Sequence, residues 1–175
     1  GIVIDITDRK MAEEALRIES SFGNGIIEHA TEGLCVCHEI EEFPHVAFSV
    51  WNNRMTEITG YTKDQINRLG WYQTVYPDPE VQARAIERMD RMRRGKDIVA
   101  EEWEITRADG ERRILSISTS ILNTNDGAVH VLALMHDLTE RKRLEGLKEE
   151  FINIAAHELR TPIAELRTLA EVGLA

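Results

Sequence analysis

The chain has 175 residues, of which 42% are hydrophobic and 30% charged, so it is long and apolar enough to bury a core and is not an unstructured tail. Lys and Arg number 21 against 31 Asp and Glu, and this net charge of −10 argues against a nucleic-acid-binding protein, whose affinity comes from neutralising phosphates. No apolar run reaches the roughly 18 residues that a membrane-spanning helix needs.

A hexapeptide near the start of the chain recurs near its end. Asp5 to Lys10 (DITDRK) returns as Asp137 to Lys142 (DLTERK), each time after an apolar run and before a helical pattern. An Asp at a helix start accepts from free backbone N–H groups, and an acid three residues later suits the first turn. We therefore expect Asp137 and Glu140 to cap a helix. The parallel predicts that residues 1–6 are the last strand of a preceding module, and that this chain, which does not begin with Met, is a segment of a modular protein.

Residues 7–23 form the first predicted helix, which we interpret as a linker. Its apolar residues follow a spacing of four and three, which suits a coiled-coil seam. The alternative is a helix that packs on its own domain. Gly23 and Gly25 are expected to weaken its far end. The apolar residues of this seam are Met11, Ala15, Ile18 and Phe22.

Two strands and two short helices are predicted next. The strands cover residues 34–40 and 46–51, on either side of a Glu-rich loop. Asn53 is placed to cap the first short helix, which ends at Gly60. The second opens at Thr62, with Gln65 as its capping-box partner, and ends at Gly70.

A longer helix and three strands complete the middle of the chain. The helix begins at Asp78-Pro79, and its basic residues from Arg84 to Lys96 are interpreted as a solvated face. Met89 and Met92, at helical spacing, are interpreted as core rather than as a ligand pocket. The strands follow an apolar alternation, and the last one is apolar on both faces, as in a central strand. They cover residues 99–105, 115–121 and 129–135.

The order of these elements predicts an α+β fold, an antiparallel sheet with helices on one face. Several short motifs in residues 24–137 resemble those of a PAS domain, a sensory module common in signalling proteins. The resemblance implies a five-stranded sheet and a small-molecule pocket between sheet and helices. The motifs are Ile27–Gly33 (IEHATEG), Trp51–Asn53 (WNN), Thr59–Thr62 (TGYT), Tyr76–Asp78 (YPD), Arg107–Gly110 (RADG) and Asp137–Arg141 (DLTER).

The resemblance allows cofactors to be considered residue by residue. A flavin photosensor of this family would need a reactive Cys in the middle helices, but residues 52–96 contain none. A haem sensor would carry its proximal His on the longer helix, but residues 79–95 contain no His. Covalent flavin and haem are therefore disfavoured, and the ligand of the pocket is unknown.

The two cysteines are the other candidate ligands. Cys35 and Cys37 are two residues apart, so they share one face of a strand and do not readily form a disulfide. Together with His38 they offer donors that suit zinc, but no second cluster supplies the remaining ligands. We interpret them as buried packing residues, assign no metal, and expect a reducing, cytoplasmic setting.

The end of the chain carries a more specific motif. Residues 138–150 are predicted to be a coiled-coil signalling linker, and residues 151–175 to begin a second domain. The six residues His157 to Pro162 (HELRTP), with Phe151 six before the His, resemble the phosphoacceptor motif of sensor histidine kinases. A zinc-protease His-Glu-x-x-His motif is excluded, because position 161 is Thr. The apolar seam of this predicted helix is formed by Leu144, Leu147, Phe151 and Ile154.

The resemblance assigns roles to four residues. It implies that His157 is the phosphoacceptor, Glu158 the general base, and Thr161 the residue associated with dephosphorylation of the response regulator. Pro162 lacks a backbone donor and is expected to act as a helix hinge.

The sequence therefore predicts a sensor segment of a two-component histidine kinase. Its PAS input would control autophosphorylation by ATP and phosphotransfer to a response-regulator Asp. ATP with Mg is implied only for a separate ATP-binding domain, which this chain lacks, so we expect the segment alone to be inactive. The expected partners are a second copy of the chain, that domain and a receiver domain. The alternative is a non-catalytic PAS module for ligand binding or dimerisation.

Overall fold

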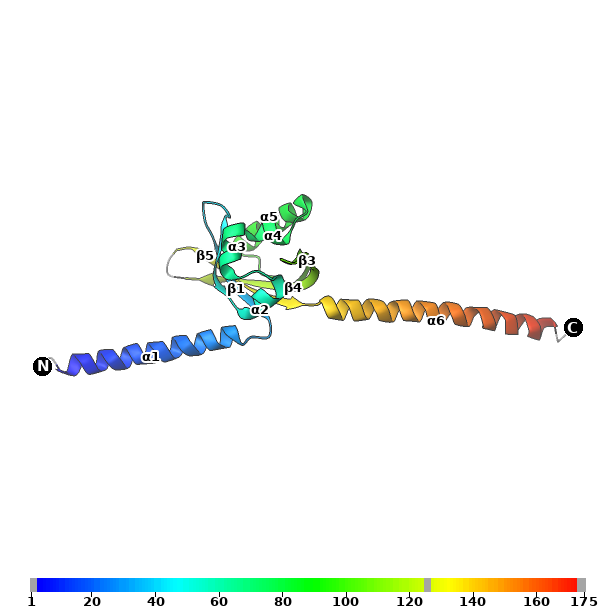
Figure 1. Ribbon diagram of the computed structural model, residues 1–175, viewed down its shortest axis with the longest axis horizontal. Coiled ribbons are helices and arrows are strands. Elements are labelled where there is room, and N and C mark those ends of the chain that lie inside the picture. The colour runs from blue at the N-terminus through cyan, green and yellow to red at the C-terminus, as the bar shows by residue number, and fades with distance from the viewer. Residues whose placement is uncertain (1–2, 125–126, 173–175) are drawn as a thin grey trace. The chain divides into compact units, whose positions relative to one another are not determined.

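The computed structural model describes residues 3–124 and 127–172 (Figure 1). Contacts divide the chain into two units, one ending at Asp137 and the other beginning at Leu138. The first contains a sheet and five helices, and the second is a single long helix. None of the helices in the described residues is both long and apolar enough to cross a membrane.

Five antiparallel strands form one sheet in the order β2-β1-β5-β4-β3. This confirms the predicted α+β, PAS-like fold. The last strand in the chain is central, as expected, because it pairs with β1 on one side and β4 on the other. The strands are β1 (Gly33–Glu39), β2 (Val46–Trp51), β3 (Ile98–Thr106), β4 (Arg112–Asn123) and β5 (Val129–Asp137).

The central strand is buried on one face only, although its sequence is apolar on both. Val131, Ala133 and Met135 face the core, whereas Leu134 on the opposite face is 36% exposed. Its central position therefore follows from pairing on both edges, and burial on both faces is not required.

Helices α2 to α5 connect β2 to β3 and pack against the core face of the sheet (Figure 1). The capping box of Thr62 and Gln65 is present, and Asp78 caps the longest of the four with Pro79 in its first turn. These two starts were predicted correctly, because the signals are local. The helices are α2 (Asn53–Thr59), α3 (Lys63–Leu69), α4 (Trp71–Val75) and α5 (Pro79–Arg93).

Two details of these helices differ from the prediction. The N-cap of α2 is Asn52, whose side chain accepts from the Met55 N–H; Asn53, the predicted cap, is the first helical residue. Helix α4 was not predicted at all. It has no side-chain cap and is stabilised by burial of Trp71, Tyr72 and Val75, which no local signal encodes.

The first helix, α1 (Val3–Glu28), is longer than predicted. It passes through Gly23 and Gly25 without a break, and residues 3–6 are helical rather than extended. The strand predicted there is therefore wrong over the described residues. A strand needs a neighbour for its ladder hydrogen bonds, and no strand of the described sheet lies beside this segment. The assignment of residues 1–6 to a preceding module stays a prediction.

The second unit is the helix α6 (Thr139–Val172). It spans all but the first residue of the predicted linker, residues 138–150, and most of the predicted phosphoacceptor segment, residues 151–175. The boundary between these two parts stays a prediction.

Candidate functional site

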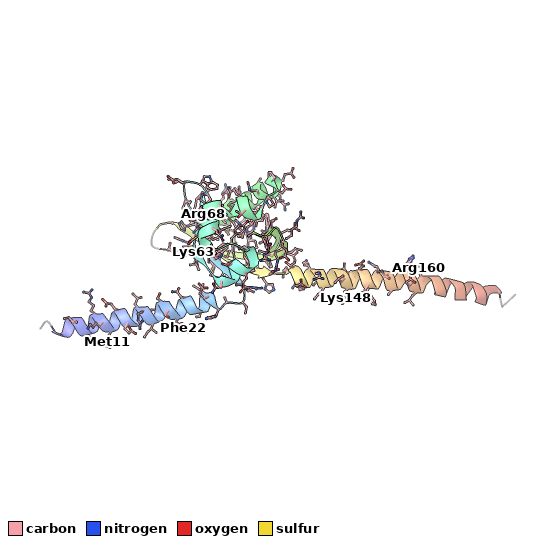
Figure 2. All side chains as sticks on the ribbon, viewed as in Figure 1. Met11, Phe22, Lys63, Arg68, Lys148 and Arg160 are labelled. Atoms are coloured by element: carbon pink, nitrogen blue, oxygen red, sulfur yellow. The ribbon has the colours of Figure 1, made fainter. Side chains whose placement is uncertain are left out.

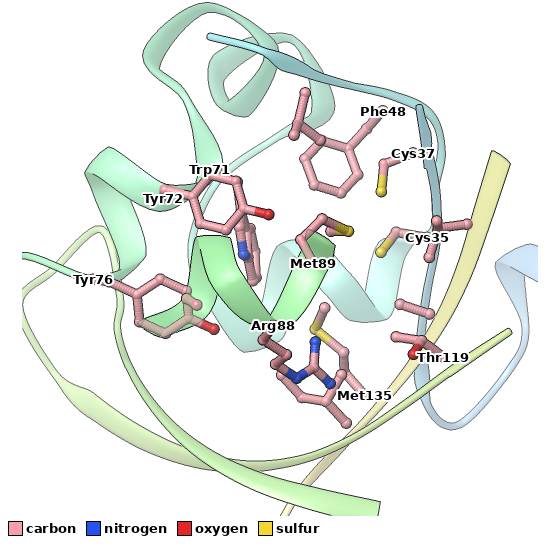
Figure 3. A pocket seen from close by; sticks show the side chains of 15 residues that line it. Cys35, Cys37, Phe48, Trp71, Tyr72, Tyr76, Arg88, Met89, Thr119 and Met135 are labelled. Atoms are coloured by element: carbon pink, nitrogen blue, oxygen red, sulfur yellow. The ribbon is translucent and has the colours of Figure 1, made fainter. Parts of the chain in front are cut away.

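A cavity lies between the core face of the sheet and helices α4 and α5 (Figure 3). Its interior volume is about 30 Å³, and all of the space between its walls, including the part open to solvent, is about 490 Å³. The strands contribute Cys35, Cys37, Val46, Phe48, Ile117, Thr119, Val131, Ala133 and Met135, and the helical side contributes Trp71, Tyr72, Tyr76, Ala85, Arg88 and Met89.

Aromatic rings form one side of this cavity and continue beyond it. Phe48 and Trp71 meet edge to face at 5.9 Å between ring centroids, and Trp71 meets Tyr76 at 6.2 Å. Tyr76 in turn meets Trp103 at 5.6 Å. Edge-to-face pairs of this kind contribute about 0.5–1.5 kcal/mol beyond their burial, so they give the cavity a rigid wall.

Arg88 is the charged residue on the cavity wall, and it is only 7% exposed. Its Nε donates to the carboxylate of Glu101, which also accepts from Trp103 Nε1 at 2.8 Å. The guanidinium carbon lies 5.7 Å from the centroid of the Trp103 ring. Burial opposes the charge of Glu101, but the hydrogen bonds from Trp103 and Arg88 together lower its pKa below the usual range.

The burial of Arg88 corrects one sequence interpretation. The basic residues from Arg84 to Lys96 were expected to form a solvated face, yet Arg88 faces the core. The helical period carried the signal, because Arg88 is three residues after Ala85 and four before Met92, and both of these are buried. Met89, interpreted as core, is partly buried and lines the cavity.

The cysteines of β1 also line the cavity, and both are free thiols. Burial raises the pKa of Cys37 to about 12 and that of Cys35 well above its ordinary value. Both thiols are therefore protonated at neutral pH, and the thiolate is the form that attacks electrophiles and binds metals. Neither cysteine has the environment of a reactive nucleophile.

The zinc donors considered from the sequence do not converge. Cys35 and Cys37 face the core, whereas His38 alternates to the opposite face of β1, where its ring lies 5.2 Å from that of His130. Within residues 3–124 and 127–172 no group of three or more His, Cys, Asp or Glu side chains is placed to hold a metal ion.

Asn52 is a buried polar residue at the corner between β2 and α2. Its Nδ2 donates to the carbonyls of Ile27 and Glu32, each at 3.0 Å. Its Oδ1 accepts from the N–H groups of Leu34 and Met55, also at 3.0 Å. One side chain therefore connects the last turn of α1, the entry to β1 and the start of α2.

The predicted phosphoacceptor lies on α6. His157 and Glu158 are helical and exposed, and consecutive helical residues point about 100° apart. Thr161 and Pro162 lie in the same helix, but their side chains fall outside the described residues. Proline has no N–H, so it cannot donate to the Glu158 carbonyl four residues earlier, and the helix lacks one bond beside the histidine.

The predicted cap residues lie at the junction of the two units. Asp137 is the last residue of β5, and its carboxylate accepts from Arg113 Nη1 at 2.7 Å. Helix α6 begins at Thr139, and Glu140 lies in its first turn, where the helix dipole stabilises a negative charge. The role of these two residues as a signal-helix cap stays a prediction.

Known proteins resemble this chain in sequence. Residues 48–135 match the model of a family described as PAS fold. A stretch of 64 residues is 32% identical to the sensor histidine kinase WalK of Bacillus subtilis (strain 168); it covers 36% of this chain and 10% of that protein. The chain therefore spans about a tenth of the length of this curated relative.

Solved structures share the architecture at low sequence identity. An RNA-binding Light-Oxygen-Voltage receptor superposes with a TM-score of 0.58 at 14% identity, over 77% of this chain and 37% of the receptor. A domain of the sensory box sensor histidine kinase/response regulator from Geobacter sulfurreducens superposes with a TM-score of 0.54 at 21% identity, over 70% of this chain and 96% of that domain. Since the family match extends over half of the residues, and the sheet and helices have the same arrangement, this chain belongs to the PAS fold family.

Proposed function

We propose that this chain is the sensor segment of a two-component histidine kinase, in which the PAS domain controls phosphorylation of His157. The observation that carries the proposal is an exposed His157-Glu158 pair on a long helix of a chain whose other unit is a PAS domain. The likeness to a sensor histidine kinase over 64 residues supports the same assignment.

The proposed chemistry is nucleophilic phosphoryl transfer. A ring nitrogen of His157 attacks the γ-phosphoryl group of ATP, so that an N–P bond forms and the P–O bond to ADP breaks. Glu158 accepts the proton from the imidazole, and exposure of both side chains leaves room for a second domain to approach. The phosphoryl group then passes to an Asp of a receiver domain, and Thr161 takes part in dephosphorylating that domain.

This chemistry needs partners that the chain itself does not supply. A separate domain of the parent protein provides ATP and Mg, and a receiver domain provides the acceptor Asp. A second copy pairs through the apolar stripe of α6, in which Leu144, Leu147 and Phe151 are each more than half exposed. Because ATP must reach His157, we place the segment on the cytoplasmic side.

Phosphorylation in trans tests this proposal. The 175-residue chain is incubated with labelled ATP and the ATP-binding domain of its full-length parent. Acid-labile, base-stable label is expected on the wild-type chain and is lost in His157→Ala. His136→Ala is the matched control, since His136 is also exposed but lies in the other unit, and it should be labelled like the wild type. Absence of label on the wild-type chain would contradict the proposal.

A non-catalytic module is the second candidate. The cavity and the exposed apolar side chains of α1 and α6 suit ligand binding and dimerisation without phosphorylation. In that case the chain binds a second copy and a ligand, while His157 remains unlabelled.

A further inference from the structure

Three buried polar atoms on the cavity wall have no hydrogen-bond partner among the described residues. They are Tyr72 Oη, Arg88 Nη2 and Thr119 Oγ1. Each of the three residues is more than nine-tenths buried, and all three line the same cavity. Buried polar groups nearly always have a partner in the protein, in water or in a ligand. Three such atoms on the wall of one cavity therefore indicate a site for a group that binds them.

The chemistry of these atoms defines that group. The guanidinium of Arg88 only donates hydrogen bonds, and both hydroxyls can donate as well. Arg88 therefore requires an acceptor, and one group can accept from all three residues if it has several lone pairs, as a carboxylate has with two oxygens and about four lone-pair sites. Glu101 occupies the Nε of Arg88 and leaves Nη2 available. None of the residues that line the cavity is acidic, and the carboxylate of Glu101 lies on the Nε side of the guanidinium.

The rest of the wall sets the shape of the ligand. Apart from these three residues and the hydroxyl of Tyr76, the lining is apolar, aromatic or thiol. The interior volume of 30 Å³ accommodates a group about the size of two waters, at roughly 10–15 Å³ each, which fits the head of a carboxylate. An apolar body larger than this requires part of the wall to move, and Met89 is a flexible, partly buried side chain of the wall that can adapt to it.

We propose that this cavity binds a small monocarboxylate with an apolar body, and that Arg88 Nη2 and the hydroxyls of Tyr72 and Thr119 donate to its carboxylate (Figure 3). The proposal depends on the proposed function only in that it makes the PAS cavity the sensory input.

Thermal unfolding of the full chain tests the proposal. The probes are sodium benzoate and the straight-chain carboxylates from butyrate to octanoate, each compared with its neutral amide and with sodium chloride at equal ionic strength. At a carboxylate concentration of about ten times Kd, binding should raise the Tm by about 3 °C or more, since a ligand that binds only the folded state stabilises it by mass action. Quenching of tryptophan fluorescence gives an independent binding curve, because Trp71 lines the cavity.

Variants identify the site. Arg88→Gln is expected to abolish the carboxylate shift, whereas Arg91→Gln on the exposed side of the same helix retains it. Tyr72→Phe and Thr119→Val keep the shape of the wall and remove hydroxyls that make no bond to any described residue. Each should weaken binding several-fold without lowering the Tm of the free protein. These two variants keep the test decisive if Arg88→Gln fails to fold.

Three results would overturn the proposal. The first is an equal shift with the amides. The second is a shift that survives in Tyr72→Phe, in Thr119→Val and in a folded Arg88→Gln. The third is no shift with any of the carboxylates. None of these results affects the labelling of His157, which is measured without carboxylate. The two proposals therefore fail separately.

Discussion

The side-chain amide of Asn52 donates to the main-chain carbonyl of Ile27 over 3.0 Å and connects the last turn of α1 to the corner between β2 and α2. The same side chain makes three further hydrogen bonds, two of them through Oδ1 to backbone N–H groups. Since Asn52 is 1% exposed, water cannot replace these bonds if the side chain is removed. The end of α1 and the start of α2 are therefore coupled through one amide.

Asn52→Ala is expected to destabilise the protein by about 2–4 kcal/mol, because it leaves several buried backbone groups without partners. Asn53→Ala is the matched control and should change the free energy of unfolding by less than about 0.5 kcal/mol, since its side chain is exposed. Urea denaturation followed by circular dichroism measures both. Equal losses in the two variants would show that the cap had been assigned to the wrong residue.

Local signals predicted most of the fold correctly. The capping box of Thr62 and Gln65 and the cap at Asp78 depend on residues within one helical turn, so the sequence contains all of the information. The choice between Asn52 and Asn53 does not depend on residues within one turn alone, because either residue can cap a helix. It is decided by Ile27 and Leu34, which are remote in sequence and accept or donate the remaining bonds.

The cavity was harder to predict than the sheet around it. The alternation of β4 placed Thr119 on the apolar face, but the sequence does not show that its hydroxyl has no partner among the described residues, because that depends on what packs over the sheet. The position of Arg88 could have been found from the helical period that it shares with Ala85 and Met92. Its pairing with Glu101 depends on where β3 lies in the fold and has no signal in the sequence.

The ion pair of Arg88 and Glu101 predicts a pH dependence of stability. The pKa of Glu101 is lower in the folded state than in the unfolded state. The ionised carboxylate therefore contributes to the free energy of unfolding above the unfolded pKa, about 4.3, and this contribution is lost as the pH falls through the lower folded pKa. Glu101→Gln should lower the free energy of unfolding by roughly 1–2 kcal/mol at pH 7. This is at the lower end of the range for hydrogen bonds to charged groups, because Glu101 is partly exposed. The difference from wild type should shrink below about pH 4.

Glu104→Gln is the control for this titration. Glu104 pairs with Arg112 on the surface, where both side chains are more than half exposed, so the loss should be at most about 0.5 kcal/mol. Urea denaturation at a series of pH values gives both curves. A Glu101→Gln deficit that stays constant down to pH 3 would contradict the assigned charge of the pair.

The two cysteines should be inert in the folded protein. Burial keeps both thiols protonated, with the pKa of Cys37 at about 12, so iodoacetamide at pH 7.5 should modify neither on a timescale of minutes. In 8 M urea both should react at the rate of an ordinary exposed thiol. Mass spectrometry of quenched samples counts the adducts, and rapid labelling without denaturant would mean that β1 opens readily.

The proposed pairing with a second copy of the chain depends on the apolar stripe of α6. Leu147 and Phe151 lie four residues apart on one side of the helix, and both are more than half exposed. Burial of one such side chain contributes about 1.5–3 kcal/mol, and a symmetric dimer buries two copies of each. Changing Leu147 and Phe151 together to Gln should therefore raise the dimer Kd at least about 100-fold.

Sedimentation equilibrium over a range of concentrations measures this effect. Glu149→Gln is the control on the same helix, since it removes an exposed charge without removing apolar surface, and the dimer should persist in it. The unfolding transition of the PAS domain should be unchanged in all variants, because these side chains lie in the other unit. If the double variant dimerises as tightly as the wild type, the second copy binds elsewhere, and the apolar surface of α1, with Met11 and Phe22 exposed, is the next to be tested (Figure 2).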